Sequence, residues 1–513
     1  MPDPFAPLIA IAHRGIPFTA SDGQAFVRLN APSSEGFYIL PVRSRAYREW
    51  FFHEFFAQFE TLPPSRAFHS LLNHLEAEAN HNLQNQRLAV WRRVGCRGGG
   101  RMPAEADAVS GPRPPAPGPC LLPAQILLNL ANPECEFVEI SPTGWKTTAG
   151  AGALLQTSRS TLPLPAPTAP APPSNPLETL RSCLNLPSRA DWLRCLAWLL
   201  AALRPDGPFP VLILQGPPGS GKTFAARILR SLIDPSTSPL TPIPSSVRDL
   251  LTLARHNWIL VFDHLSTLSP QLSDALCRLS SGLGATLRET VGPAVEPLQQ
   301  YYKRPVLLTV TERWSCPADL GRRALTVSFP PLTPLTEDSL LTVFEHAWPE
   351  IIAALCSAVS VALSRMNHIH PPSGRCPDAL AWAMAASPAL GCTEEEMRQA
   401  FALADPHPMA EAVRNLIEQR RHFAGSATQL LELLQPVVGC HTPTVLSRQL
   451  RSCMLTLADS GIELKFRRLH EGAKIIEISD DPGDASCEKM PPDASPNLAP
   501  PPQTTETEDL TVR

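Results

Sequence analysis

The segment that most constrains the fold of this 513-residue chain is GPPGSGKT, Gly216 to Thr223. It matches the pattern GxxxxGK[ST], in which glycines let successive backbone N–H groups turn inward around a phosphate. The apolar strand VLILQ (211–215) precedes the motif, and the helix TFAARILRSLI (223–233) follows it. The N-terminus of that helix adds its dipole to the anion site. Motif and context together predict a strand, loop and helix that bind ATP or GTP.

Each residue of this loop has an expected role. Lys222 is predicted to reach the β- and γ-phosphate oxygens, and the Thr223 hydroxyl is predicted to bind Mg²⁺. The predicted nucleotide contacts are Gly216, Pro217, Pro218, Gly219, Ser220, Gly221, Lys222, Thr223 and Phe224.

The next apolar strand, WILVF (258–262), ends at Asp263. A carboxylate at that position can hold the water shell of a magnesium ion beside the first strand, so Asp263 is predicted to be a metal-site residue. The alternative is a strand-end aspartate that caps a turn. His264 follows, where many ATP-hydrolysing machines have a glutamate that activates water. We therefore predict that Glu289 activates the water, and His264 remains an alternative that orients it by hydrogen bonding.

The strand PVLLTV (305–310) carries Thr309 near its end, and Thr311 follows. A polar side chain at the tip of such a strand is in place to sense the γ-phosphate. Thr309 is therefore predicted to contact the nucleotide.

Changes in composition and periodicity divide the chain into segments. Apolar strands alternating with amphipathic helices at 177–331 indicate a βαβ sheet, and mostly helical patterns indicate a lid at 332–407. The other predicted segments are an α+β N-terminal domain (1–160) with a Gly/Pro-rich disordered insertion (96–123), a Pro-rich linker (161–176), a winged-helix-like domain (408–478) and a disordered acidic tail (479–513).

The segment 408–478 reads as three helices followed by two strands, the outline of a winged helix. Basic side chains on its third helix and on or near its hairpin are predicted to contact DNA phosphates. These are Arg448, Arg451, Arg467, Arg468 and Lys474. The alternative is a winged helix that serves only to pack against protein.

The formal net charge of −4 does not by itself indicate a nucleic-acid-binding protein. The segment 480–513 carries eight acidic and two basic side chains, so the rest of the chain is slightly basic. Any contact with DNA is therefore expected to be local.

The thirteen cysteines include no CxxC pair and no Cys/His cluster at zinc spacing, which argues against a structural zinc site. The N-terminus lacks a basic segment followed by an apolar core, so no signal peptide is expected. The most apolar run, Cys195 to Leu203, is about half the length needed to cross a bilayer. These features predict a soluble, cytoplasmic protein without a membrane partner.

The runs GPFPVLILQGPPGSGKT, RDL, LSDALCRLSSG, RPVLLTV and DLGRRAL resemble the P-loop ATPases carried by prophages, plasmids and other bacterial mobile elements. Members of this family are often described as primase-helicase-like ATP-binding proteins. The resemblance continues through WPEIIAALCSAVSVAL to FAGSATQLLELL and the GIEL…KIIEI end, and so covers most of the chain. It implies an α/β fold with a P-loop NTPase core of the AAA+/helicase type. It also implies a homo-oligomeric ring, with a hexamer favoured, that uses ATP and Mg²⁺.

In such rings an arginine of one subunit reaches the γ-phosphate held by its neighbour. The position that matches the family's DLxxR arginine is Arg323, with Arg322 beside it, and Arg375 is a weaker candidate for a second sensor. Each of these could instead be an ordinary surface arginine. The sequence departs from the family at His264, where an asparagine is more common, and at TVGPAVEP (290–297), where a tyrosine-rich turn is usual. The insertion at 96–123 interrupts a region that is continuous in relatives.

Two functions remain open from the sequence. The first is a DNA-dependent, helicase-like ATPase of a mobile genetic element. The second is a non-hydrolysing, ATP-gated interaction or DNA-binding regulatory protein, which the absence of a glutamate after Asp263 favours. A primase with its own polymerising site would need clustered acidic metal ligands, and Glu60, Glu76, Glu78 and Glu105 form no such pattern.

Overall fold

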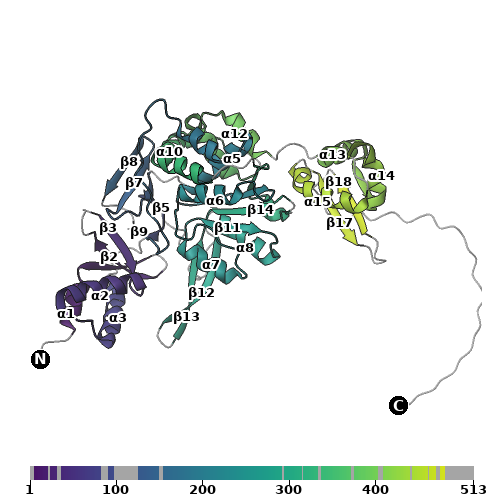
Figure 1. The fold of residues 1–513 in the computed structure, drawn as a ribbon. Coiled ribbons are helices and arrows are strands. Elements are labelled where there is room, and N and C mark those ends of the chain that lie inside the picture. The colour runs from purple at the N-terminus through teal and green to yellow at the C-terminus, as the bar shows by residue number, and fades with distance from the viewer. Residues whose placement is uncertain are drawn as a thin grey trace, which may run out of the picture.

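The structure is a computed structural model, and it describes most of the chain between residues 5 and 479 (Figure 1). The described ranges are 5–20, 23–31, 36–81, 90–97, 125–149, 154–291, 294–312, 314, 316–332, 337–370, 375–402, 408–438, 442–459, 462–468 and 474–479. Most of the predicted insertion and nearly all of the predicted tail therefore lie outside the described residues.

The N-terminal part contains a three-stranded antiparallel sheet in the order β1-β2-β3. Three helices pack on it through an apolar core that includes Leu8, Val27, Tyr47 and Leu71. The elements are α1 (Ala6–Ala12), β1 (Gly15–Thr19), β2 (Ala25–Asn30), β3 (Phe37–Pro41), α2 (Arg45–Phe59) and α3 (Ser65–His81). Aromatic side chains recur along α2 because this helix buries one face against α3 and the sheet.

A second antiparallel sheet, in the order β5-β6-β7-β8, follows. Its buried residues, such as Ile126 and Val138, belong to the same core as helices of the central part of the chain. The Trp145 indole donates a hydrogen bond to Ser357 Oγ at 3.0 Å. The strands are β5 (Val94–Arg97), β6 (Gln125–Asn129), β7 (Glu136–Ser141) and β8 (Gly144–Ala149), with β4 (Val90–Trp91) and β9 (Leu154–Leu155) as a short parallel pair.

The predicted Pro-rich linker does not separate two cores. Within it, Leu164 N–H donates to Leu130 O at 2.8 Å, and Thr168 N–H donates to Pro349 O at 3.2 Å. The segment is therefore fixed to the strands before it and to a helix far beyond it. The hydrophobic core crosses the boundary that composition alone predicts.

The centre of the molecule is a four-stranded parallel sheet in the order β11-β14-β10-β15. Its strands are nearly continuous apolar runs because helices cover both faces. Alternate residues of β10 face different cores: Val211 and Ile213 face one, and Leu212 and Leu214 face the other. The elements are β10 (Val211–Gly216), α6 (Lys222–Ser231), α7 (Val247–His256), β11 (Leu260–Leu265), α8 (Pro270–Ser281), β14 (Val306–Thr311), α9 (Ala318–Gly321) and β15 (Ala324–Ser328).

Helices that precede and follow this sheet in the chain pack together as one bundle beside it. They are α4 (Pro176–Cys183), α5 (Arg189–Ala202), α10 (Glu337–Arg365), α11 (Pro377–Ala386) and α12 (Glu394–Phe401), with short 3₁₀ turns at Met366–His368 and Ser387–Leu390. The apolar α5 is buried on all sides, which matches its lack of a polar face. Among the described residues, one helix, Glu337–His368, is long and apolar enough to cross a membrane, and 56% of its most apolar window is buried inside the protein.

A long antiparallel hairpin, β12 (Leu283–Val291) and β13 (Ala294–Tyr302), lies between α8 and β14 and was not predicted from the sequence. It extends away from the body of the molecule (Figure 1). Its base lies at the edge of the parallel sheet where the strands begin, because Ser280 O accepts from Phe209 N–H at 2.8 Å just before β10.

The C-terminal part has a core of its own, which includes Val413, Leu430, Leu450 and Ile476. Three helices precede a hairpin whose second strand also pairs with a short strand after the first helix, giving the order β16-β18-β17. The elements are α13 (Pro408–Arg420), β16 (His422–Gly425), α14 (Ala427–Val438), α15 (Pro443–Asp459), β17 (Glu463–Arg468) and β18 (Lys474–Ser479). Figure 1 shows this part beside the rest of the molecule.

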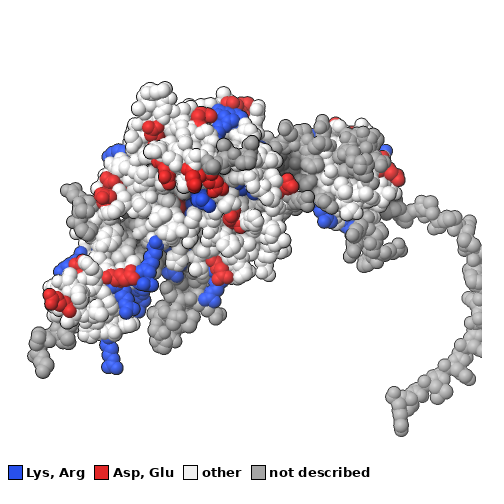
Figure 2. Space-filling model, in the orientation of Figure 1, with Lys and Arg blue, Asp and Glu red and all other residues white. Residues whose placement is uncertain are grey.

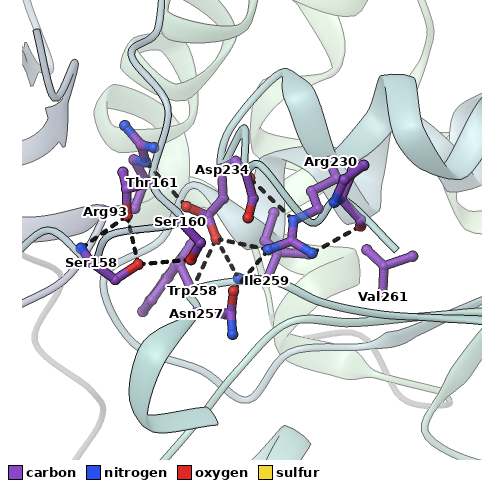
Figure 3. A network of polar contacts seen from close by, with 12 residues as sticks. Arg93, Ser158, Ser160, Thr161, Arg230, Asp234, Asn257, Trp258, Ile259 and Val261 are labelled. Carbon is purple, nitrogen blue, oxygen red and sulfur yellow. Dashed lines mark hydrogen bonds and ion pairs between the residues drawn. The ribbon is translucent and has the colours of Figure 1, made fainter. Parts of the chain in front are cut away.

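A buried polar network joins the N-terminal part to the central sheet (Figure 3). Arg93, between β4 and β5, donates from Nε to Asp234 Oδ1 at 3.2 Å. The other carboxylate oxygen, Asp234 Oδ2, accepts the backbone N–H groups of Trp258 and Ile259 at 3.0 and 3.1 Å. Arg230, near the end of α6, donates to Asp234 O at 3.2 Å and to Asn257 Oδ1 at 2.9 Å. One aspartate thus connects the helix after the loop, the start of β11 and the N-terminal part.

Candidate functional site

The predicted loop lies between β10 and α6, at the edge of the sheet where the parallel strands end. Gly219 and Gly221 have φ values of +75° and +85°, in the left-handed region that favours glycine. At Gly216 the constraint is space, since a Cβ there would lie 2.2 Å from the carbonyl oxygen of Phe329. The backbone path therefore favours glycine at Gly216 and Gly221, which the pattern specifies, and also at Gly219, which it does not.

Lys222 begins α6 and folds back over the loop. Its Nζ donates hydrogen bonds to Gly216 O at 2.9 Å, to Pro217 O at 2.6 Å and to Ser220 Oγ at 3.0 Å. Burial lowers the pKa of this ammonium below its usual value, while the negative charges of Asp263 and Glu312 act in the opposite direction. The cation is thus held among oxygen atoms at the place where a phosphate chain enters such a loop.

Asp263 is brought to the loop from β11. Its Oδ1 accepts hydrogen bonds from Thr223 Oγ1 at 3.1 Å and from Thr309 Oγ1 at 2.5 Å. Its backbone N–H donates to Thr241 O at 3.0 Å. The Thr223 and Thr309 hydroxyls therefore hold the carboxylate beside the first residues of α6, and the bond to Thr241 fixes the Asp263 backbone. The hydroxyl and carboxylate oxygens are ligands that Mg²⁺ prefers, so Thr223 and Asp263 fit the predicted metal.

His264 occupies an irregular position in β11. The pairing of β11 with β14 shifts between Phe262 and Leu265, and His264 has a φ of +63°. Its backbone N–H donates to Thr309 Oγ1 at 2.8 Å, and its side chain is exposed. The bulge lets Thr309 bind both Asp263 and His264, and it turns the imidazole outward.

The tip of β14 brings a carboxylate that was missed from the sequence. In the parallel register Thr311 pairs with Gly216, so Glu312 follows directly beside the loop. The Gln215 amide donates to Glu312 O at 3.0 Å. The sequence signal was the set of polar residues Thr309, Thr311 and Glu312 at the end of an apolar strand. The sequence alone does not show that β14 lies next to β10, so these residues could not be placed beside the loop.

Glu289 is not brought to the loop within one chain. It lies on β12, paired with Glu296 across the hairpin. The hairpin starts at the edge where the parallel strands begin, and the loop lies at the edge where they end. The expectation that Glu289 activates the water is therefore corrected for a site built by one copy, because β12 and β13 pair with each other as a projecting hairpin instead of returning to the sheet.

Arg323 and Arg375 also lie at the edge opposite the loop. Arg323 O accepts the N–H of Val211, the first residue of β10, at 2.9 Å, and Arg375 Nη1 donates to Ala324 O at 3.1 Å. Arg322 and Arg323 line a cleft of about 920 Å³ between α8, α9 and α11. Within one chain, neither Arg375 nor Arg323 therefore joins Lys222 at the loop.

Of the remaining predicted nucleotide contacts, Phe224 points away from the loop. Its side chain is buried in the hydrophobic core, so its backbone is the part left near the site. Pro217 and Pro218 lie on the loop itself, partly and largely exposed.

The predicted DNA-contact residues are distributed over α15 and the C-terminal hairpin. Arg451 is exposed, and its guanidinium lies 4.9 Å from the centre of the Phe466 ring. Arg467 pairs with Glu477, with 3.1 Å between Nε and Oε2. The backbones of Arg448, Arg468 and Lys474 are on α15, β17 and β18, and their side chains lie outside the described part. α15 and the hairpin therefore carry all five residues.

On the face in Figure 2, acidic and basic side chains are interspersed in small groups over the described residues.

Two family models match the chain. One, described as Actinomycete integrative conjugative element replication protein, matches residues 178–378. The other, described as AICE RepA C-terminal domain, matches residues 409–492. The search of curated proteins found no match.

Solved structures give distant similarities. An apo structure of the NrS-1 C-terminal region is 10% identical with a TM-score of 0.38, covering 93% of this chain and 99% of that chain. A crystal structure of JCV helicase with a bound acetamide compound is 15% identical with a TM-score of 0.22, covering 43% of this chain and 74% of that chain. Similarity at these TM-scores does not support an argument about function.

The first family match contains the loop, Asp263 and Arg323, and the second contains the unit built by α13–β18. In these two parts, the chain is similar to a replication protein of a mobile genetic element.

Proposed function

We propose that this chain is a Mg²⁺-dependent ATPase that acts on DNA in the replication of a mobile genetic element, as a helicase-like motor. The observation that carries the proposal is the joining of Lys222, Thr223 and Asp263 at the end of the parallel sheet, with Thr309 bonded to the aspartate. A second support is the family match over residues 178–378.

Each residue of the site has a separate role in phosphoryl transfer. The loop N–H groups and Lys222 hold the β- and γ-phosphates and balance the charge that develops on the γ-phosphate oxygens. Thr223 and Asp263 hold Mg²⁺, which neutralises phosphate charge when bound. Thr309 fixes the orientation of the Asp263 carboxylate, because its hydroxyl donates to Oδ1 and accepts from the His264 N–H.

The proposed active form is a ring of identical subunits, for which we favour a hexamer. Arg323 lies at the sheet edge where the strands begin, and Lys222 lies at the edge where they end. An arginine so placed can complete only the nucleotide site of an adjacent copy. A head-to-tail arrangement with rotational closure meets this requirement.

DNA contact is assigned to the winged-helix-like C-terminal unit. The argument is the order of its elements, the exposed Arg451 on α15 and Arg467 on the hairpin. These side chains are suited to phosphate contacts that carry no sequence information.

The direct test measures ATP turnover with and without single-stranded and duplex DNA. We expect DNA-stimulated, Mg²⁺-dependent turnover in the wild type, reduced about 100-fold or more in Lys222→Ala. Lys303→Ala is the matched control, because Lys303 pairs with Asp206 at 2.9 Å, away from the loop. Tight ATP binding without turnover under every condition would refute the motor.

That result would favour the second candidate, an ATP-gated regulatory protein that binds DNA or a partner without hydrolysis. The specific observation in its favour is His264 at the position after Asp263, held on a bulge with its side chain outward.

A further inference from the structure

We propose that Glu312 is the catalytic residue that orients the attacking water and accepts its proton. The proposal rests on the ATPase function proposed above and names the carboxylate that the position after Asp263 does not supply.

The first argument is the register of the sheet. β14 lies between β10 and β11, and its last residue, Thr311, is the partner of Gly216, the first residue of the loop. Neighbouring strands lie about 4.8 Å apart, so the residue after Thr311 is beside the residue after Gly216. Glu312 thus follows a strand that lies between β10, which leads into the phosphate loop, and β11, which carries Asp263.

The second argument is that this turn is fixed. The Gln215 side-chain amide donates to Glu312 O at 3.0 Å and to Trp314 O at 3.3 Å. Trp314 N–H donates to Thr311 O at 3.1 Å, and the Trp314 ring is buried in the core beneath the sheet. The loop strand therefore holds the backbone of Glu312 directly, and a catalytic carboxylate requires such a support.

The third argument is that the Glu312 carboxylate, unlike that of Asp263, is accessible to water and not committed to another role. Asp263 accepts two hydroxyl hydrogen bonds and faces the predicted metal, so it is committed to another task. The Glu312 side chain is exposed, and among the described residues none donates a hydrogen bond to its carboxylate. Its negative charge still acts on Lys222, where it opposes the lowering of the lysine pKa by burial. A carboxylate open to water and near the phosphate-binding lysine has the chemistry of a general base.

The step balances as follows. The water oxygen forms a bond to the γ-phosphorus while the bond from that phosphorus to the β–γ bridging oxygen breaks, and ADP leaves with the electron pair. The water proton passes to the Glu312 carboxylate and then to phosphate or solvent. Two competitors are less well placed. The His264 imidazole is turned outward by the bulge, and Glu289 is on the hairpin at the opposite edge.

The test compares Glu312→Gln with Glu289→Gln and His264→Asn in the full chain. Glutamine keeps the size of the side chain and removes the base, and thermal unfolding checks that each variant folds. Affinity for a fluorescent ATP analogue and steady-state turnover are measured on the same samples. We expect Glu312→Gln to bind within about threefold of wild type and to lose turnover by about 100-fold or more. Glu289→Gln is expected to keep wild-type turnover.

The two proposals fail in different ways. Absence of turnover in the wild type refutes the ATPase function itself. Normal wild-type turnover with Glu312→Gln within about threefold of it refutes the assignment of Glu312 and leaves the ATPase function standing. A loss of turnover in His264→Asn with Glu312→Gln unaffected overturns the assignment in favour of His264.

Discussion

Replacing Asp234 with alanine should loosen the contact between the N-terminal part and the central sheet. Arg93 and Asp234 have side chains that are only 2% and 8% exposed, so the pair is shielded from water. Arg230 lies 4.0 Å from the same carboxylate with its side chain 2% exposed. Two buried guanidinium groups thus depend on one carboxylate (Figure 3). Burial lowers the pKa of both arginines, which marks the cost of keeping them charged there.

The size of the destabilisation follows from the buried charged groups that remain after Asp234 is replaced with alanine. Breaking a buried ion pair by removing one partner costs about 3–5 kcal/mol, because the remaining charge stays buried without compensation. The Trp258 and Ile259 N–H groups lose their acceptor as well. These losses all arise from one carboxylate and are not additive, so we take the cost of breaking the Arg93–Asp234 ion pair as the expected loss of stability. Arg93→Met should cost less, because it removes one buried charge and leaves Asp234 with Arg230.

Amide hydrogen exchange measures the loss of stability at the backbone groups that bind Asp234. A loss of about 3 kcal/mol corresponds to roughly 100-fold faster exchange of the Trp258 and Ile259 amides if they open locally. Peptides of the C-terminal part, which has a separate core, serve as the internal control. Unchanged exchange at these two amides in Asp234→Ala, or an equal effect in both variants, would refute the reasoning.

Three further predictions concern the site and the C-terminal unit. Gly216→Ala forces a Cβ to 2.2 Å from Phe329 O, so nucleotide affinity should fall about tenfold or more by titration. Thr309→Val removes the hydroxyl bonded to Asp263, so stability in urea should fall by about 1–3 kcal/mol and turnover should fall with it; unchanged turnover argues against a positioning role. Arg451→Ala should weaken DNA binding equally for unrelated sequences and lower the salt slope by about 1; a sequence-dependent loss would contradict phosphate contact.

Local patterns predicted much of the secondary structure. The apolar runs at 211–215 and 305–310 became β10 and β14. These predictions needed only residues close in sequence, because periodicity reports which face is buried. The loop could also be predicted, because GPPGSGKT matches GxxxxGK[ST] in full and lies between an apolar strand and a helix.

The remainder depends on contacts between distant residues. The order β11-β14-β10-β15 puts Glu312 beside the loop, and no local pattern states which strand lies next to β10. Glu289 is closer in sequence to Asp263 than Glu312 is, but it lies on a hairpin that starts at the opposite edge of the sheet. Arg93 is a buried partner of Asp234, 141 positions away, and no local pattern marks that pairing. Sheet order and long-range pairing therefore set the limit of the sequence analysis.

The central claim is that one copy's phosphate loop and the next copy's Arg323 form one ATP site. The most direct measurement mixes Lys222→Ala and Arg323→Ala proteins after each alone is shown to lack turnover. In a random one-to-one ring, about a quarter of the interfaces combine an intact lysine with an intact arginine. We predict that turnover returns toward that fraction of the wild-type value. No recovery on mixing, or full turnover by Arg323→Ala alone, would contradict a shared site.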